Sequence, residues 1–150
     1  MTIDLPGLED AEVQAFANLV RAHAAVTRDL SGELVGAHGL TINDYEVLLR
    51  LARAPDRRMR RVDLAQQVLL TQSGITRLLD GLEDAGYVEK VSCESDARVA
   101  YAHITDVGVE RLCAASKSHF ASIRERFLAR FDREELRRLS ELLARLLPEP

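Results

Sequence analysis

The spacing of apolar residues over positions 62–108 predicts two short helices followed by two strands and a further helix. In the first helix, Leu64, Val68 and Leu69 lie at positions i, i+4 and i+5, which is one apolar face. The second helix shows the complete amphipathic spacing i, i+3, i+4 and i+7, with the apolar residues Ile75, Leu78, Leu79 and Leu82.

Turn and cap residues mark the boundaries of these elements. Thr71 is a good N-cap for the second helix, because its hydroxyl can accept a hydrogen bond from a free backbone N–H group. Gly86 matches the left-handed residue that ends many helices. Residues 87–88 begin a strand, residues 99–104 are rich in β-branched and aromatic side chains, and residues 93–98 form a polar hairpin loop. This order predicts a winged helix-turn-helix, a shape suited to a DNA groove.

The outward face of the second helix carries the candidate base-contacting side chains. Four polar residues of its first two turns lie off the apolar stripe: Gln72, Ser73, Thr76 and Arg77. Gln can pair with adenine, Arg with guanine, and Ser or Thr with either base. Any solvated helix has a polar face, so the four residues alone do not favour DNA; the predicted wing beside them does.

The ordered set of motifs resembles the MarR family of transcriptional regulators over nearly the whole chain. The motifs are Leu64-Ala65, Thr76-Arg77, Leu82-Glu83 followed by Gly86, Asp96-Ala97-Arg98, and Thr105 with Gly108 after it. The resemblance implies a mainly α fold with a small β-wing (α+β), in which a winged helix-turn-helix is joined to N- and C-terminal helices that form a dimerisation region.

The chain departs from the family pattern at three positions. Tyr87 stands where family members usually have Leu, and Lys90 where they usually have Arg. Val62 occupies the expected N-cap position before Asp63, and Val is a poor cap. None of these changes removes a polar side chain that would face the groove.

The resemblance also implies how DNA would be bound. The arginine that matches Arg98 enters the minor groove, and Asp96 could hold its guanidinium through a charge-assisted hydrogen bond. The family forms obligate homodimers, so two winged helices would face two half-sites of a pseudo-palindromic operator in double-stranded DNA, about one helical turn apart.

The formal net charge of −4 is a weak argument against nucleic acid, because local charge decides the contact. A basic cluster precedes the first of the two short helices predicted above and consists of Arg57, Arg58, Arg60 and Arg61. We predict that this cluster, with Thr71, contacts DNA phosphates, which would make binding strongly salt-dependent. For any single arginine of the cluster, a solvated loop position is an equally good interpretation.

The length of 150 residues predicts one domain, spanning 1–150. Its DNA-binding lobe covers about residues 41–104, and its dimerisation helices cover about 8–37 and 105–147. Thr41 and Asp44 form a capping-box pattern, and Pro55 ends the helix that follows.

Thr105 can cap a long helix that runs to Phe131, after which Asp132 starts another. The terminal helices carry all four phenylalanines and many leucines. These apolar side chains could be buried in a self-contained core of one subunit. Intertwining of the terminal helices from two subunits explains them better.

The signal that would control DNA binding is less defined. Family members often place an aromatic ligand in a crevice beside the dimer helices, where His23 and Tyr45 could line the walls with Leu48 as an apolar side. Each of the three fits an ordinary core or interface position better. Cys93, beside the wing, could report oxidation, although a structural role suits it better; with Cys113 it makes no disulfide framework.

Catalytic motifs do not stand out. The four histidines form no His-x-x-x-His pattern, there is no Cys-x-x-Cys pair, and no Gly-rich phosphate loop occurs. We therefore expect no enzyme activity, no metal and no cofactor. No apolar run reaches membrane length and no secretory signal pattern is present, so we expect no membrane association and a cytoplasmic location.

Three functional hypotheses follow. The leading one is a DNA-binding regulator, a repressor released by a small aromatic or phenolic effector. The second is a thiol-based redox regulator of the same fold. The third is a helical interaction protein that no longer binds DNA.

Overall fold

The computed structural model describes Gly7, residues 9–68 and residues 70–148. Leu8, the predicted start of the N-terminal helix, and Leu69 lie outside the described residues. The elements in chain order are α1 (Asp10–His38), α2 (Ile42–Arg53), η1 (Pro55–Arg57), β1 (Arg58–Arg60), α3 (Arg61–Gln67), α4 (Gln72–Asp84), β2 (Val88–Ser92), β3 (Ala100–Ile104), α5 (Asp106–Arg126), η2 (Leu128–Arg130) and α6 (Arg133–Ala144).

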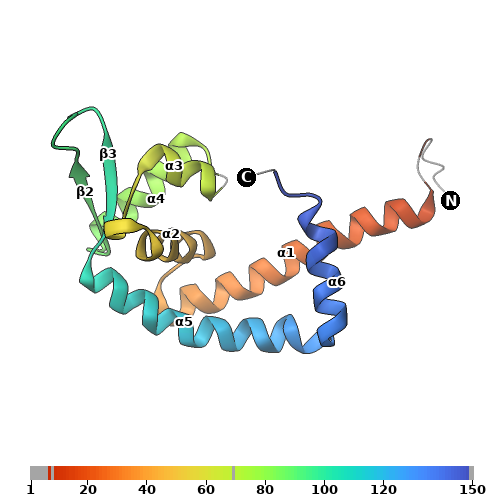
Figure 1. Cartoon of the computed structure of the whole chain (residues 1–150). Helices are drawn as coiled ribbons and strands as arrows, with labels where there is room; N and C mark the ends of the chain where they lie inside the picture. Colours follow the sequence, from red (N-terminus) through yellow and green to blue (C-terminus); the bar gives the residue numbers. More distant parts are fainter. Residues whose placement is uncertain (1–6, 8, 69, 149–150) are drawn as a thin grey trace.

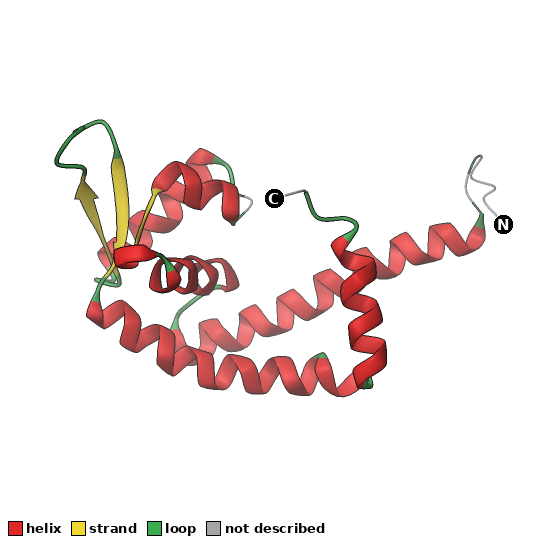
Figure 2. Ribbon diagram, viewed as in Figure 1, coloured by secondary structure: helices red, strands yellow, loops and turns green. Residues whose placement is uncertain are grey.

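A winged-helix lobe occupies one end of the molecule. Figure 1 shows α2, α3 and α4 gathered with the strands, while α1 and α5 extend away from this lobe. The small sheet and the many helices, drawn in yellow and red in Figure 2, confirm the predicted mainly α fold with a β-wing.

The wing contains a strand that the sequence pattern did not predict. The sheet is antiparallel with the order β1-β3-β2, and Ala102 of β3 pairs with Met59 on one side and Lys90 on the other. The sequence pattern places residues 58–60 in a basic segment ahead of the first helix. A three-residue edge strand with a single apolar side chain is too short to show period-two alternation.

The hydrophobic core lies in the lobe. The largest fully buried side chains come from α1, α2, α3, α4, β3 and the α1–α2 connection: Leu34, Leu40, Val47, Leu48, Leu51, Leu64, Ile75, Leu79 and Ile104. The helix α5 adds Leu112 and Ala115 to this cluster. No residue of α6 is buried within the single chain.

Most of the predicted caps are present. The hydroxyl of Thr71 accepts a hydrogen bond from the Gly74 N–H at 3.0 Å. Thr41 with Asp44 forms a capping box, and Asp132 caps α6 in the same way. Thr105 caps α5. Short polar side chains therefore fix the starts of these four helices.

Two predicted boundaries were wrong. The helix α3 begins at Arg61 with Arg60 as its N-cap, so Val62 lies inside the first turn; the acidic Asp63 in that turn binds the Arg60 guanidinium at 2.7 Å. The helix α5 ends at Arg126 instead of running to Phe131. The chain turns at Phe127, which brings its ring to 5.5 Å from that of Phe131 in an edge contact.

The start of α5 is packed tightly against the base of the wing. The Thr105 hydroxyl donates to the Gly86 carbonyl at 2.7 Å, and the Thr105 N–H donates to the Tyr87 carbonyl at 3.0 Å. A Cβ atom on Gly108 would lie 2.2 Å from that same Tyr87 carbonyl oxygen. Gly108 therefore permits an approach of helix to strand that no other residue allows.

We expect Gly108→Ala to lower the free energy of unfolding by about 1–3 kcal/mol, because the added methyl group overlaps a backbone carbonyl that cannot move away freely. The matched control is Gly81→Ala in α4, where a Cβ meets no atom within 4 Å. That change should raise stability by about 0.5–1 kcal/mol. Urea unfolding followed by circular dichroism measures both; equal stability of the two variants would contradict the packing described.

Candidate nucleic-acid interface

The helix α4 is held by one face and exposes the other. Ile75, Leu79 and Leu82 are buried in the core of the lobe. This packing fixes the rotation of the helix about its axis, so the opposite face must point outward. The four residues predicted from sequence are all exposed, namely Gln72, Ser73, Thr76 and Arg77.

Local hydrogen bonds occupy the small hydroxyls of this face and leave the long side chains free. The Ser73 hydroxyl lies 3.2 Å from the Thr71 hydroxyl, and the Thr76 hydroxyl donates to the Gln72 carbonyl at 2.9 Å. Within residues 9–68 and 70–148, the Gln72 amide and the Arg77 guanidinium have no hydrogen-bonding partner. These two side chains are the ones best able to reach an external acceptor or donor.

The tip of the wing presents one organised arginine. The side chain of Arg98 is 92% exposed, yet its Nε lies 3.1 Å from Asp96 Oδ1 and its Nη2 lies 3.3 Å from Oδ2. The Arg98 backbone N–H also donates to Oδ1 at 3.0 Å. These hydrogen bonds from Arg98 lower the pKa of the Asp96 carboxyl. Figure 1 shows the β2–β3 hairpin that carries this pair projecting from the lobe.

The arginines of the basic cluster have partners within the chain, which the solvated loop, the alternative to phosphate contact, did not include. Arg57 Nη1 lies 3.0 Å from Asp106 Oδ1 at the start of α5. Arg60 binds Asp63 through two nitrogens, at 2.7 and 2.9 Å. Both arginines therefore already have carboxylate partners, and both are half exposed.

The other two arginines of the cluster also have internal contacts. The guanidinium carbon of Arg58 lies 5.2 Å from the centre of the Tyr101 ring, a cation–π distance. Only 19% of the Arg61 side chain is exposed, and its Nη2 lies 3.9 Å from Asp80 Oδ1. Phosphate contact by the cluster stays a prediction, and Arg61 has the least surface to offer for it.

Ligand binding by His23, Tyr45 and Leu48 stays a prediction; Tyr45 and Leu48 lie one turn apart on α2 in the core, whereas His23 lies on α1. Leu48 is fully buried in the core and has no surface to line a crevice. Tyr45 is also buried, with its hydroxyl 2.9 Å from the Ser116 hydroxyl. His23 is exposed on α1, and it precedes the core residue Leu34 by eleven positions, about 16 Å along the helix axis.

One buried histidine was missed by the sequence reasoning. His119 of α5 is 8% exposed, and its ring lies 4.6 Å from that of Tyr45. Burial lowers the pKa of His119, and the nearby carboxylate of Glu33 opposes that shift. Glu33 and His119 both line a hollow of about 330 Å³ between α1 and α5. The sequence does not predict this burial, because a single histidine within an amphipathic helix can be either buried or exposed.

The two cysteines differ in setting. Cys113 is exposed, whereas Cys93 is half-buried beside the wing with its sulfur 3.1 Å from the Ser95 hydroxyl. This hydrogen bond lowers the pKa of the Cys93 thiol. Oxidation sensing by Cys93 stays a prediction.

The described ranges contain neither a candidate metal site nor a helix able to span a membrane. Residues 9–68 and 70–148 contain no group of three or more His, Cys, Asp or Glu side chains placed to hold a metal ion. None of the helices in these ranges has both the length and the apolar content needed to cross a membrane.

Known proteins share this arrangement. The family described as MarR matches residues 38–99. The crystal structure of AbsC, a MarR family transcriptional regulator from Streptomyces coelicolor, superposes with a TM-score of 0.88 at 31% identity over 95% of both chains. Sco3205, a MarR family transcriptional regulator from the same organism solved in complex with DNA, gives a TM-score of 0.90 at 26% identity, over 97% of this chain and 91% of that one.

A curated relative agrees over a shorter span. The HTH-type transcriptional regulator PrsX from Escherichia coli is 29% identical over 107 residues, which cover 69% of this chain. The match spans 64% of the length of PrsX, just under two thirds.

An exposed helix face beside a β-wing, on a lobe joined to long terminal helices, defines a winged-helix transcriptional regulator. The chain belongs to the MarR family. The three relatives named above are transcriptional regulators.

Proposed function

We propose that this protein binds double-stranded DNA through α4 and the wing. The observation that carries the proposal is that the lobe exposes both the polar face of α4 and the Arg98 guanidinium at the wing tip. Membership of the MarR family supports it. So does the similarity to Sco3205, whose structure is a complex with DNA.

Each element would contact a different part of the duplex. The exposed face of α4 fits the major groove, where Gln72 and Arg77 can pair with base edges and Ser73 and Thr76 add shorter contacts. The wing fits the minor groove, where the Asp96 carboxylate would hold the Arg98 guanidinium in place. The half-exposed arginines of the basic cluster and Thr71 would contact phosphates.

The active form in this proposal is a homodimer. The N- and C-terminal segments leave many large apolar side chains partly or largely exposed in the single chain: Phe16, Leu19, Val20, Phe120, Leu128, Phe131, Leu142, Leu143, Leu146 and Leu147. A second copy packed on these helices would bury them. The resulting two-fold symmetry matches a pseudo-palindromic operator with half-sites about one DNA turn apart.

The regulatory role proposed is repression, relieved when a small aromatic or phenolic effector binds. Binding an operator blocks access of other proteins to that DNA, and the family resemblance supports effector control. Binding to chromosomal DNA would also place the protein in the cytoplasm. A thiol-based signal is the second candidate, favoured by the lowered pKa of the Cys93 thiol next to the wing.

We expect Arg77 and Arg60 to affect DNA binding in different ways. Arg77→Ala should weaken binding by about 1–3 kcal/mol and relax the preference at one base pair, because a base contact is lost. Arg60→Ala should weaken all sequences alike and reduce the salt slope by about one, because a phosphate contact is lost. Fluorescence anisotropy on duplexes selected from a random library measures both effects.

The control for this experiment is Arg124→Ala, an exposed arginine in the last turn of α5. Its base preference should equal that of the unmodified protein. If Arg77→Ala leaves base preference unchanged, then Arg77 does not contact bases.

We expect deletion of residues 132–150 to convert the dimer into a folded monomer that binds DNA weakly. The deletion removes α6 and its exposed leucines but no residue of the core cluster, which includes nothing beyond Ala115. Sedimentation velocity should show the change in mass while circular dichroism retains the helical signal.

A point variant tests the same interface on the other terminal helix. Phe16 is 70% exposed in the single chain, so Phe16→Asp should weaken the dimer without unfolding the lobe. A truncated chain that stays dimeric would place the interface elsewhere.

A further inference from the structure

One side chain, Arg111 of α5, lies between the end of α1 and the base of the wing. Its Nη1 donates to the carbonyl of His38, the last residue of α1, at 3.5 Å. Its guanidinium carbon lies 5.4 Å from the centre of the Tyr87 ring, a cation–π distance. Tyr87 directly precedes β2, and Figure 1 shows the start of α5 at the base of the β2–β3 hairpin. Arg111 therefore contacts two segments that lie far apart in the sequence.

The charge of Arg111 is balanced without a carboxylate. Arg111 is only partly exposed, and within residues 9–68 and 70–148 it forms no ion pair. Two weaker partners take that place. One is the carbonyl at the negative end of the α1 helix dipole, and the other is the π face of Tyr87. A partly buried cation is costly when it has no partner, so Arg111 favours the arrangement that keeps both contacts.

The end of α1 is held against α5 at a second point. His38 Nε2 lies 2.7 Å from the Ser118 hydroxyl. Arg111 and Ser118 are seven residues apart on α5, which is about two helical turns, so both side chains lie on the same side of the helix. The contact of Arg111 with Tyr87 is thus made from an anchored position.

Tyr87 is in turn fixed at the base of the wing. Its side chain packs against the core cluster, and its carbonyl accepts the Thr105 N–H at 3.0 Å. A leucine at this position would keep an apolar side chain but would offer no π face to Arg111. The aromatic ring is therefore what connects Arg111 to the residue from which β2 begins.

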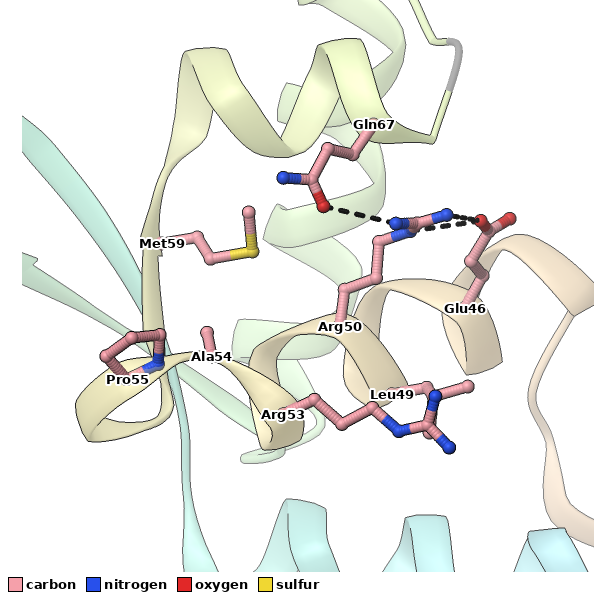
Figure 3. Close-up of a pocket in the computed structure, with 8 residues that line it drawn as sticks. All are labelled: Glu46, Leu49, Arg50, Arg53, Ala54, Pro55, Met59 and Gln67. Atoms are coloured by element: carbon pink, nitrogen blue, oxygen red, sulfur yellow. Dashed lines mark hydrogen bonds and ion pairs between the residues drawn. The ribbon is translucent and has the colours of Figure 1, made fainter. Parts of the chain in front are cut away.

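The helix α4 is anchored by a different arginine. Figure 3 shows Arg50 of α2 between Glu46 and Gln67. Its Nη1 donates to Gln67 Oε1 at 3.1 Å, and its Nε and Nη2 donate to Glu46 Oε1 at 3.1 and 2.8 Å. Gln67 ends α3, the helix that precedes α4. The helices α3 and α4 are thus tied to α2 by contacts that do not involve Arg111.

We propose that Arg111 is a positioning residue for DNA binding, which sets the angle of the wing relative to α4. This role rests on the function proposed above. The five residues of β2 cover about 17 Å at about 3.3 Å per residue, so a rotation of about 10° at Tyr87 moves the far end of the strand by about 3 Å. A shift of that size exceeds the range of distances over which a hydrogen bond forms, so it would take the Arg98 guanidinium out of its groove contact.

The first test compares substitutions on both sides of the cation–π contact. Arg111→Gln and Tyr87→Leu should each weaken binding to a duplex selected from a random library about fivefold, measured by fluorescence anisotropy. Tyr87→Phe keeps the aromatic ring and should bind like the unmodified protein. Because both single changes remove the same contact, the double variant should bind about as well as Arg111→Gln alone.

A second background separates positioning of the wing from a general loss of structure. If Arg111 acts through the wing tip, Arg111→Gln should not further weaken the binding of an Arg98→Ala variant, whereas a general loss of structure would weaken both backgrounds alike. Each effect is measured relative to Lys117→Gln, which removes one positive charge from an exposed position of α5. Circular dichroism confirms that each variant keeps its helical signal; the Tyr87 variants carry the test should Arg111→Gln fail to fold.

Two results overturn the proposal: Tyr87→Leu binding as tightly as Tyr87→Phe, or Arg111→Gln weakening both backgrounds equally. If Arg98→Ala itself leaves binding unchanged, then the proposed wing contact is wrong, and the role of Arg111 falls with it. The failure of Arg111 alone is therefore distinguishable from a failure of the proposed function.

Discussion

Burial of the apolar stripe of α4 is the constraint on which the rest of the molecule depends. Ile75, Leu79 and Leu82 can enter the core only if the helix takes one rotation about its axis, and that rotation exposes the polar face. Replacing any one of these side chains by Ala would remove about 2–5 kcal/mol, a large part of a typical folding free energy of about 5–15 kcal/mol. The same packing thus stabilises the lobe and aims its candidate base-contacting residues.

Charge is distributed so that an acidic protein can still present basic groups. The chain has a formal net charge of −4, yet the guanidinium of Arg98 stands nearly fully exposed at the wing tip. Its pairing with Asp96 orients that group before any partner arrives, so less conformational entropy is lost on binding. The arginines of the basic cluster are oriented in a similar way by Asp106, Asp63 and the Tyr101 ring.

Sequence periodicity and cap chemistry were enough to predict the winged helix, because its elements carry strong local signals such as the i, i+3, i+4, i+7 stripe of α4 and the Thr71 cap. They did not predict β1, whose partner strand lies more than forty residues away. They also grouped His23 with Tyr45 and Leu48, but they could not show that Tyr45 and Leu48 are buried in the core while His23 is exposed on α1. The pairing of β1 depends on tertiary contacts that a local pattern does not contain.

Hydroxyl-radical footprinting on a duplex selected from a random library tests the central claim most directly. If α4 and the wing of each subunit bind DNA, the unmodified protein protects two patches related by two-fold symmetry, about one helical turn apart, each flanked by minor-groove protection. Arg98→Ala should lose the flanking protection first. Selection that enriches no sequence, or a single uniform footprint that Arg98→Ala does not alter, would contradict the account.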